Sequence, residues 1–484
     1  MDKLININLI KSKWIWILLI SFETFLGYIT ILMPQYIMPV FIGMIGLVFL
    51  ILWPEFSYTL AVLTLANQLF LISTTTSEHL PFVIKYIEAH HSNIKMIPFI
   101  LNDIMLFTAF ISCIIAKWAK AREPYPQTPI DLPVKLFFLW IALSSLWASS
   151  LKGLLIESVP LLGALFGFYL SVSLIRTKKM LTFTIGAFIF LGIINAVLAI
   201  ASLRCDEYSF QVFQYNSFRL SFQWNTIPKV RGHGLSYTQC TAYFLNLSII
   251  LAVGLFLLAK GRKKIGILLI ALLLTAGQLS TISKGGLLGL IAGLTFLYIN
   301  YKPLKGYFLT AMVITFTTIV VLFPLVRFVE FGKNLSGVGR SIGGGSAETR
   351  AIIWNQTLSD MWNKTSGLGY GIGEMVPSHN IFLSVFFELG IIGFSIWLWL
   401  LAKFFYSIKI ITSKPINPYY QTMLLCLASG MISSLCFGMV DMVYFDETLW
   451  MILGISMALF NLAKCSETLQ IQKTPLQGRY AIVH

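Results

Sequence analysis

The sequence predicts an all-α fold, a polytopic transmembrane bundle of 12 to 14 helices, on three observations. Hydrophobic residues make up 57% of the 484-residue chain, and charged residues only 11%, against about 25% in an ordinary soluble domain. The mean hydropathy is +0.79. Apolar runs recur along nearly the whole chain. A soluble core of this size cannot bury so much apolar surface, so lipid is the expected solvent.

The apolar runs are counted as membrane spans because about 20 apolar residues in a helix cross the hydrocarbon layer. The first run follows Lys3, Lys11 and Lys13 and has no small-residue cleavage site after it, which predicts a retained span rather than a signal peptide. The predicted spans are 14–33, 37–53, 56–72, 98–116, 133–149, 155–175, 180–202, 236–259, 265–281, 285–300, 307–325, 380–402, 419–438 and 447–463. The turn at Pro54 and the short run 133–149 set the lower limit of 12.

The orientation follows from the distribution of basic residues, because short cytoplasmic connections are enriched in Lys and Arg. Alternate connections carry most of the cations: 117–122, 176–179, 260–264, 302–305 and 403–414. The remaining connections mix cations with acids. We therefore expect a bacterial inner-membrane protein with both termini in the cytoplasm. The net charge of +15 then faces anionic membrane lipids, and no nucleic-acid partner is expected.

The chain is predicted to form one integral-membrane domain, 1–484, that includes a large periplasmic loop, 326–379, and ends in a cytoplasmic tail, 464–484. The large loop contains a glycine-rich run, 367–373, which lacks the preceding strand and the lysine of a nucleotide-binding loop. This run predicts either flexible turns or a backbone surface for a glycan or phosphate.

Three ionisable residues stand at span ends on the predicted outer side, where such groups are functional candidates. Lys284 lies between two apolar runs with only small polar neighbours, and it either binds an anion or extends to the interface. Arg231 is followed by glycines at 232 and 234, which allow a ligand to approach the backbone, although a lipid-headgroup anchor is an alternative.

His379 stands at the predicted start of the span 380–402, with Ser378 as the expected N-cap. The positive end of a helix disfavours the imidazolium cation, and a neutral imidazole is what a general base requires. The alternative is a hydrogen-bonded histidine at a membrane interface.

These motifs together resemble the O-antigen ligase and O-antigen polymerase family. His379-Asn380 followed after nine residues by Gly390-Ile391-Ile392-Gly393 resembles the family signature. The stretches 348–354 and 367–371 are similar to its large periplasmic loop, and 283–288 is similar to its Ser-Arg-Gly motif, with Lys284 in place of arginine. Lysine keeps the charge but lacks the two-pronged guanidinium geometry. The resemblance covers residues 225–400 well, and the first half only by topology.

The resemblance implies a glycosyltransferase of the GT-C type that moves a glycan from undecaprenyl diphosphate to an acceptor hydroxyl on the periplasmic face. It assigns the catalytic site to His379, Arg231 and Lys284, with Arg231, Lys284 and Arg350 binding the diphosphate. No metal and no cofactor are expected. The implied partners are the lipid-linked polysaccharide donor and an acceptor, either lipid A–core or a second lipid-linked glycan.

Three functions remain open on the sequence. O-antigen ligase, with lipid A–core as acceptor, is preferred because the match around His379 and Gly390 is clean. A polymerase of O-antigen or exopolysaccharide would use the same site. The alternative of another class is a transporter of lipid-linked glycans, which usually shows repeated halves and broken helices at the midplane.

Overall fold

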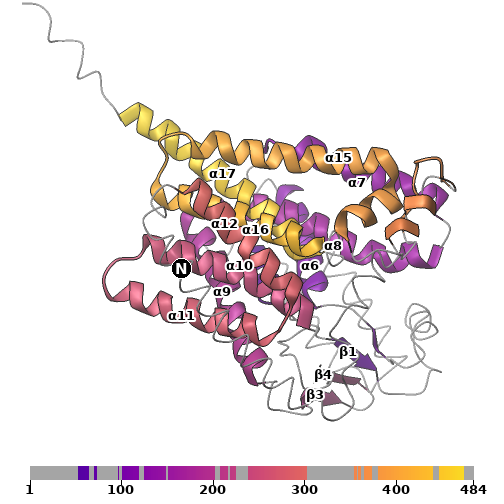
Figure 1. Ribbon diagram of the computed structural model, residues 1–484, viewed down its shortest axis with the longest axis horizontal. Coiled ribbons are helices and arrows are strands. Elements are labelled where there is room, and N and C mark those ends of the chain that lie inside the picture. The colour runs from indigo at the N-terminus through magenta and orange to yellow at the C-terminus, as the bar shows by residue number, and fades with distance from the viewer. Residues whose placement is uncertain are drawn as a thin grey trace, which may run out of the picture.

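The computed structural model describes a helical bundle with one small sheet (Figure 1). The residues described are 53–64, 70–73, 96–97, 101–118, 125–148, 151–201, 208–215, 218–224, 238–301, 354–356, 358–360, 363, 365–372, 380–439 and 446–473. The predicted spans 14–33, 37–53 and 307–325 lie outside these residues.

Six described helices are long and apolar enough to cross a membrane, and they identify the chain as a multi-pass membrane protein. They are α9 (Lys178–Ala201), α10 (Thr238–Leu258), α11 (Arg262–Ser280), α15 (Ile381–Thr412), α16 (Pro418–Gly438) and α17 (Glu447–Lys473). The other described helices are α4 (Pro54–Thr64), α6 (Leu101–Trp118), α7 (Asp131–Ser144) with the 3-10 turn η2 (Ser145–Trp147), α8 (Leu151–Leu174) and α12 (Lys284–Asn300).

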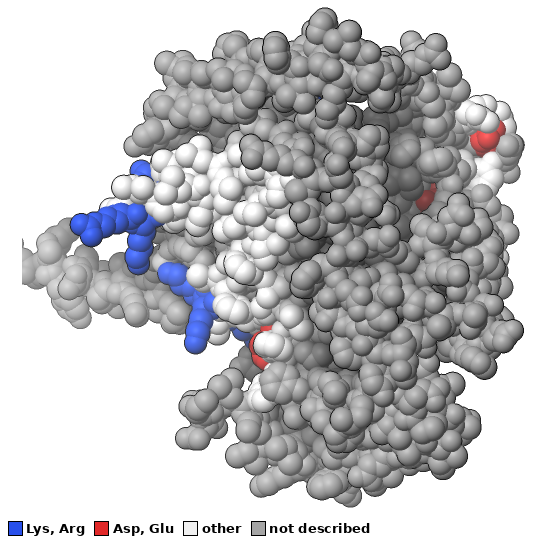
Figure 2. All heavy atoms as spheres, turned by 90° about the horizontal axis from the view of Figure 1, so that it is seen from below, with Lys and Arg blue, Asp and Glu red and all other residues white. Residues whose placement is uncertain are grey.

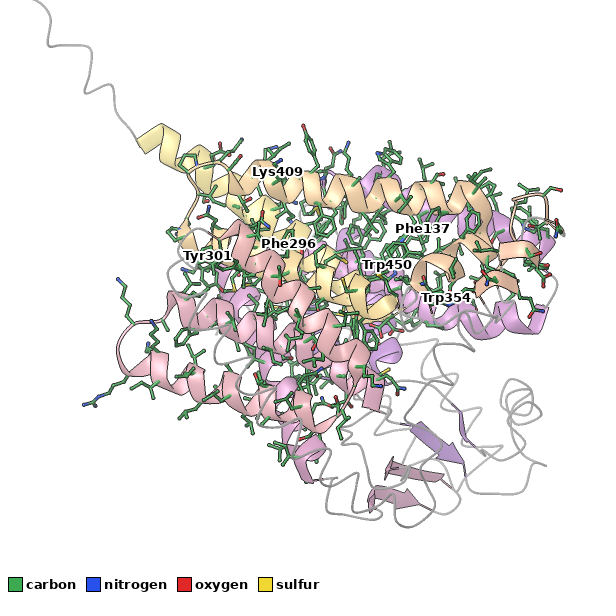
Figure 3. The ribbon with its side chains drawn as sticks, in the orientation of Figure 1. Phe137, Phe296, Tyr301, Trp354, Lys409 and Trp450 are labelled. Atoms are coloured by element: carbon green, nitrogen blue, oxygen red, sulfur yellow. The ribbon has the colours of Figure 1, made fainter. Side chains whose placement is uncertain are left out.

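One end of the bundle gathers basic side chains and is called the basic end below. Its cations are Lys178, Lys179, Lys260, Arg262, Lys263, Lys264, Lys409 and Lys414. Three contacts bring these helix ends together. Lys178 Nζ lies 4.7 Å from the centre of the Tyr419 ring, Lys414 pairs with Glu467 at 3.1 Å, and Thr422 donates to the Tyr301 hydroxyl. In Figure 3, Lys409 and Tyr301 lie toward the left of the bundle and Trp354 toward the right.

Large aromatic side chains join the helices in the middle of the bundle. Trp397 of α15 and Trp450 of α17 are fully buried, with ring centres 5.8 Å apart. Phe137 of α7 stacks on Trp450 at 5.8 Å and lies 5.3 Å from Trp397 (Figure 3). Aromatic pairs at these distances add to the burial of large apolar areas, so this cluster fixes α7, α15 and α17 relative to one another.

The helices α12 and α16 approach closely because small residues face each other. A Cβ at Gly289 would lie 2.7 Å from the Ser433 carbonyl oxygen, and one at Gly293 would lie 2.8 Å from that of Ser429. Glycine and serine four residues apart on both helices form the small-residue interface that membrane helices use in place of a hydrophobic driving force.

The all-α prediction is wrong in one respect, because four strands form an antiparallel sheet in the order β2-β1-β4-β3. They are β1 (Phe70–Ser73), β2 (Met96–Ile97), β3 (Tyr208–Tyr215) and β4 (Phe218–Trp224). The predicted span 56–72 is corrected with it, since α4 ends at Thr64 and the last three residues of that run belong to β1. A short apolar run is compatible with helix or strand, and hydropathy alone does not separate them.

Two other boundaries differ from the prediction. The predicted tail 464–484 begins inside α17, which continues to Lys473. The helix α15 extends ten residues beyond the predicted span 380–402, and Gly390 breaks it into two pieces. The second piece, 391–412, is about 33 Å long and is alone sufficient to cross the hydrocarbon.

Candidate functional site

Of the four predicted site residues, the structure describes Lys284 alone. His379, Arg231 and Arg350 lie outside the described residues. The structure does describe the helices that follow two of them in the chain: α15 begins two residues after His379, and α10 begins seven residues after Arg231. The candidate site is therefore located from the start of α12, which carries Lys284, and from the starts of α15 and α10.

Lys284 is the first residue of α12 and is exposed. The preceding turn is tight: Thr281 and Ile282 donate from their backbone N–H groups to Gln278 and Leu279 at the end of α11. Ser283 is the N-cap, and its hydroxyl accepts from the Gly286 N–H at 3.1 Å. This cap fixes the first turn of α12, so the backbone of Lys284 has a defined position at the end of the bundle opposite the basic end.

The cap of α15 differs from the expected one. Asn380, not Ser378, is the N-cap, and its side-chain oxygen accepts from the N–H groups of Phe382 and Leu383 at 3.0 and 3.2 Å. The Asn380 amide nitrogen donates to the Met439 carbonyl, 3.2 Å away, just past the end of α16. Asparagine can accept with its oxygen and donate with its nitrogen at once, so one side chain both begins α15 and ties it to α16.

Lys284 and Asn380 lie at the same level of the bundle, on two helices that both pack on α16. The close approaches of Gly289 to Ser433 and of Gly293 to Ser429 show that α12 and α16 run antiparallel in a constant register. Continuing this register puts Lys284 level with Gly438. Asn380 is hydrogen-bonded to the next residue, Met439. The starts of α12 and α15 therefore lie at the same end of the bundle, next to the end of α16.

The start of α10 lies at this end as well. Asn246, two turns into α10, donates to the Gly286 carbonyl of α12 at 2.7 Å. Gly289 and Gly293 of α12 face Asn246 and Ile250 of α10 in turn, so the two helices run side by side in the same direction. Three helix N-termini, those of α10, α12 and α15, thus share one end of the bundle. Each carries the partial positive charge of a helix N-terminus, which favours an anion there.

The glycine-rich run 367–371 has a structural function that the sequence analysis did not foresee. Gly390 has φ +65°, and the break that it makes in α15 leaves backbone groups without helical partners. Tyr370 and Gly371 donate to the carbonyls of Phe387 and Glu388, and Ile391 donates to the Gly367 carbonyl, all at 2.9 to 3.0 Å. The Trp140 indole N–H, from α7, donates to the Leu389 carbonyl at 2.8 Å.

These bonds exclude both expected interpretations of residues 367–371. The N–H groups of Leu368 and Gly369 donate to the backbone and side chain of Thr365, so four consecutive amides, 368–371, are already used within the protein. They are neither flexible turns nor a cradle for phosphate. Irregular backbone inside a membrane protein is stable where the protein itself satisfies it, and this run does so for the broken helix.

A buried polar cluster behind Lys284 was missing from the sequence analysis. Gln278 is 2% exposed, and neither of its amide atoms has a hydrogen-bond partner among the described residues. Its nitrogen would lie 2.6 Å from a Cβ at Gly286, in the first turn of α12. Asn246 and Ser433 line the next turn of α12. Amides within apolar runs are the sequence signal that could have pointed to this cluster.

Within the described part of the chain, no group of three or more His, Cys, Asp or Glu side chains is arranged to hold a metal ion. No model of a known protein family matches the chain, and no curated protein matches its sequence.

Proposed function

We propose that this protein is a membrane glycosyltransferase that moves a glycan from a polyprenyl diphosphate, undecaprenyl diphosphate by the resemblance, to an acceptor hydroxyl. The observation that carries the proposal is the position of Lys284. This exposed cation at the start of α12 lies level with the start of α15, at the end of the bundle opposite the basic end. The sequence attaches His379 to that start of α15 and Arg231 to the nearby start of α10.

The proposed reaction needs cations more than it needs an acid. The acceptor oxygen attacks the anomeric carbon, and the bond from that carbon to the diphosphate oxygen breaks. A diphosphate is a stable anion and leaves without a proton, so the developing charge is stabilised by Lys284, Arg231 and Arg350. His379 accepts the proton of the acceptor hydroxyl. The three helix N-termini add positive potential at the same end.

By orientation, the proposed site faces the periplasm. The basic end of the bundle is assigned to the cytoplasm of a bacterial inner membrane, because Lys and Arg concentrate on that side. The donor lipid then presents its diphosphate to Lys284 at the opposite surface. O-antigen ligase, with lipid A–core as the acceptor, is the preferred reaction on the resemblance around His379 and Gly390, and a polymerase would differ in the acceptor alone.

A transporter of lipid-linked glycans is less well supported. Transporters use the free backbone ends of broken helices to bind substrates and ions. In α15, the carbonyls of Phe387, Glu388 and Leu389 each accept a hydrogen bond from residues 370, 371 and 140. These three carbonyl groups at the break are therefore bonded within the protein and are not the free backbone ends that a transported ligand would need.

The Lys284 series tests the proposal in a strain that lacks the chromosomal copy of the gene. Lys284→Ala is expected to lower glycan transfer by about 100-fold or more, because it removes a charge that stabilises the leaving group. Lys284→Arg is expected to retain most of the activity, because the charge remains. The measurement is the amount of glycan attached to acceptor on a lipopolysaccharide gel, normalised to protein in the membrane. Equal loss in both variants would contradict a charge-based role.

His379→Ala provides the second arm, with an expected loss of about 100-fold or more at normal membrane abundance. Lys409→Ala, at the basic end, is the matched control and is expected to transfer glycan normally. Normal transfer by His379→Ala would refute the base assignment. The strain without the gene separates the two reactions: core lacking any repeat, with accumulated lipid-linked polymer, indicates ligase, whereas core with one repeat indicates polymerase.

A further inference from the structure

The first turn of α11 has an unusual charge arrangement. Its first three residues are Arg262, Lys263 and Lys264. Lys260 stands just before them, separated only by Gly261. Cations at a helix N-terminus oppose the helix dipole, and these four also repel one another. The N-cap is Gly261, which has no side chain that could accept from the first amides. This turn therefore gathers positive charge that the helix itself does not compensate.

The helix α9 brings two more cations to the same place. A Cβ at Gly277 of α11 would lie 2.5 Å from the Ala196 Cα of α9, and both helices start at the basic end. Continued backwards, this pairing puts Lys179 level with Lys260, with Lys178 beside them. Neither α9, α10 nor α11 contains an acid. The helices α4 and α17, which also pack on α9, contribute Glu55 and Glu467 at this end, and two carboxylates, one of them paired with Lys414, cannot neutralise six cations.

An apolar surface continues directly from this basic turn. Ile265, Leu268, Leu269 and Leu272 are 61%, 42%, 61% and 51% exposed, and their spacing puts them on one face of α11. Only 17% of the most apolar stretch of α11 is buried inside the protein, against 72% of the corresponding stretch of α10. Figure 2, seen from the side of α11 in Figure 1, shows blue cations at one end of the molecule beyond a white surface.

We propose that the α10–α11 turn and this face of α11 bind an anionic phospholipid, with its phosphate on Lys260, Arg262 and Lys263 and an acyl chain along Ile265, Leu269 and Leu272. Charge complementarity selects the occupant: the turn requires an anion, and the adjoining stripe requires an apolar chain. Lys264 lies over the Phe256 ring at 4.7 Å and stabilises the turn instead. This site is independent of the proposed glycan transfer, which takes place at the opposite end.

The test is a titration of the full-length protein, in detergent, with dioleoylphosphatidylglycerol, followed by native mass spectrometry of the first bound lipid. Arg262→Gln/Lys263→Gln is expected to weaken this binding by about tenfold or more, because each cation near an anionic lipid contributes separately. Lys403→Gln/Lys409→Gln is the matched control, with two exposed cations removed from α15. Lys409 lies in the last turn of α15, where the helix dipole already favours it. The control is expected to change binding less than twofold.

Three outcomes would overturn the proposal. Equal weakening in the control would indicate a general charge effect of the basic end. Equal binding of dioleoylphosphatidylcholine would indicate an apolar surface without charge selection. Displacement of the lipid by millimolar inorganic phosphate or glycerol phosphate would indicate a free-anion site. Lys263→Gln alone, with an expected loss of about fivefold, supplies the same comparison if the double variant does not fold.

Discussion

At the scale of single residues, Gly390 has the most demanding position in the described chain. Its φ is +65°, and a Cβ there would lie 2.3 Å from the Leu368 carbonyl carbon and 2.4 Å from the Gly367 oxygen. Both obstacles are backbone atoms in a run held by hydrogen bonds to α15, so neither can move aside at low cost. The residue is required for the break and for the docking of residues 367–371 against it.

Gly390→Ala is expected to destabilise the protein by about 2–4 kcal/mol, because the left-handed conformation and the backbone overlap both disfavour a Cβ. Thermal unfolding in detergent measures the effect, followed by the reaction of the buried Cys426 with a thiol-reactive dye in a background whose other cysteines are replaced by serine. Gly266→Ala is the control, since Gly266 lies in α11 with no atom within 4 Å of a Cβ. It should raise stability by up to about 1 kcal/mol through helix propensity. A Gly390→Ala protein as stable as the control would contradict the docking.

Asp446 is a second residue whose position makes a measurable difference. It caps α17 by accepting from the Thr448 N–H at 2.8 Å, yet burial raises the pKa of its carboxyl, because desolvation outweighs the hydrogen bonds from Thr448 and Leu449. In the folded protein the neutral form is favoured relative to the unfolded chain. The native state then binds more protons than the unfolded state above the ordinary aspartate pKa, and stability falls as pH rises through that window.

Asp446→Asn should preserve the cap and remove this part of the pH dependence. The variant is expected to be as stable as the natural protein below the ordinary aspartate pKa, and increasingly more stable as the pH rises from that value to the raised pKa of Asp446, above which the difference is constant. Unfolding temperatures measured from pH 4 to 8 test it. Parallel curves for the two proteins would show that the carboxyl does not ionise differently on folding.

At the scale of elements, the pairing of α12 with α16 decides where Lys284 lies. The register of Gly289 and Gly293 against Ser433 and Ser429 sets how far α12 extends at its N-terminus. Larger residues at the glycines would force the helices apart, since the opposing atoms are backbone carbonyls. The position of a candidate functional cation thus depends on two residues without functional groups, one and two turns away.

Gly289→Val should cost about 1–3 kcal/mol by overpacking this interface, partly offset by the better helix propensity of valine. It should also lower glycan transfer, because Lys284 moves with α12. Thermal unfolding and the transfer assay together measure the two effects, with Gly266→Ala again as the control. A variant with normal unfolding temperature and normal transfer would show that the interface tolerates separation.

The small sheet shows what pattern analysis can find at this scale. The strands β3 and β4 read Tyr208-Ser-Phe-Gln-Val-Phe-Gln-Tyr215 and Phe218-Arg-Leu-Ser-Phe-Gln-Trp224, with polar residues largely alternating with apolar ones and two residues between the strands. This pattern is typical of a hairpin and was available in the sequence. The pairing of β1 with β4 joins segments about 150 residues apart, for which no local signal exists.

At the scale of the whole molecule, the two ends of the bundle differ in charge. The helix connections at one end carry the cations of the basic end, and the other end has the capped starts of α12 and α15. In a membrane, this asymmetry predicts that the basic end faces the cytoplasm.

Sidedness can be measured with single cysteines at Lys263 and Lys284 in a variant whose native cysteines are replaced by serine. A membrane-impermeant maleimide should label Lys284→Cys in cells with a permeabilised outer membrane, and Lys263→Cys only in inverted vesicles. The reverse pattern would place the candidate site on the cytoplasmic side and contradict the proposed function.

The sequence by itself determined the solvent of this protein, because a chain with so few charges has no other means of burying its apolar surface. It also determined the boundaries of α9, α10, α11 and α16 to within a few residues, and the charge asymmetry of the connections, whereas α15 and α17 each extend ten residues past their predicted ends. Tertiary structure alone decided the break at Gly390, the docking of residues 367–371, and the common level of Lys284 and Asn380. Each of these depends on contacts between segments far apart in the chain, and such contacts leave no periodicity in the sequence for hydropathy or propensity to detect.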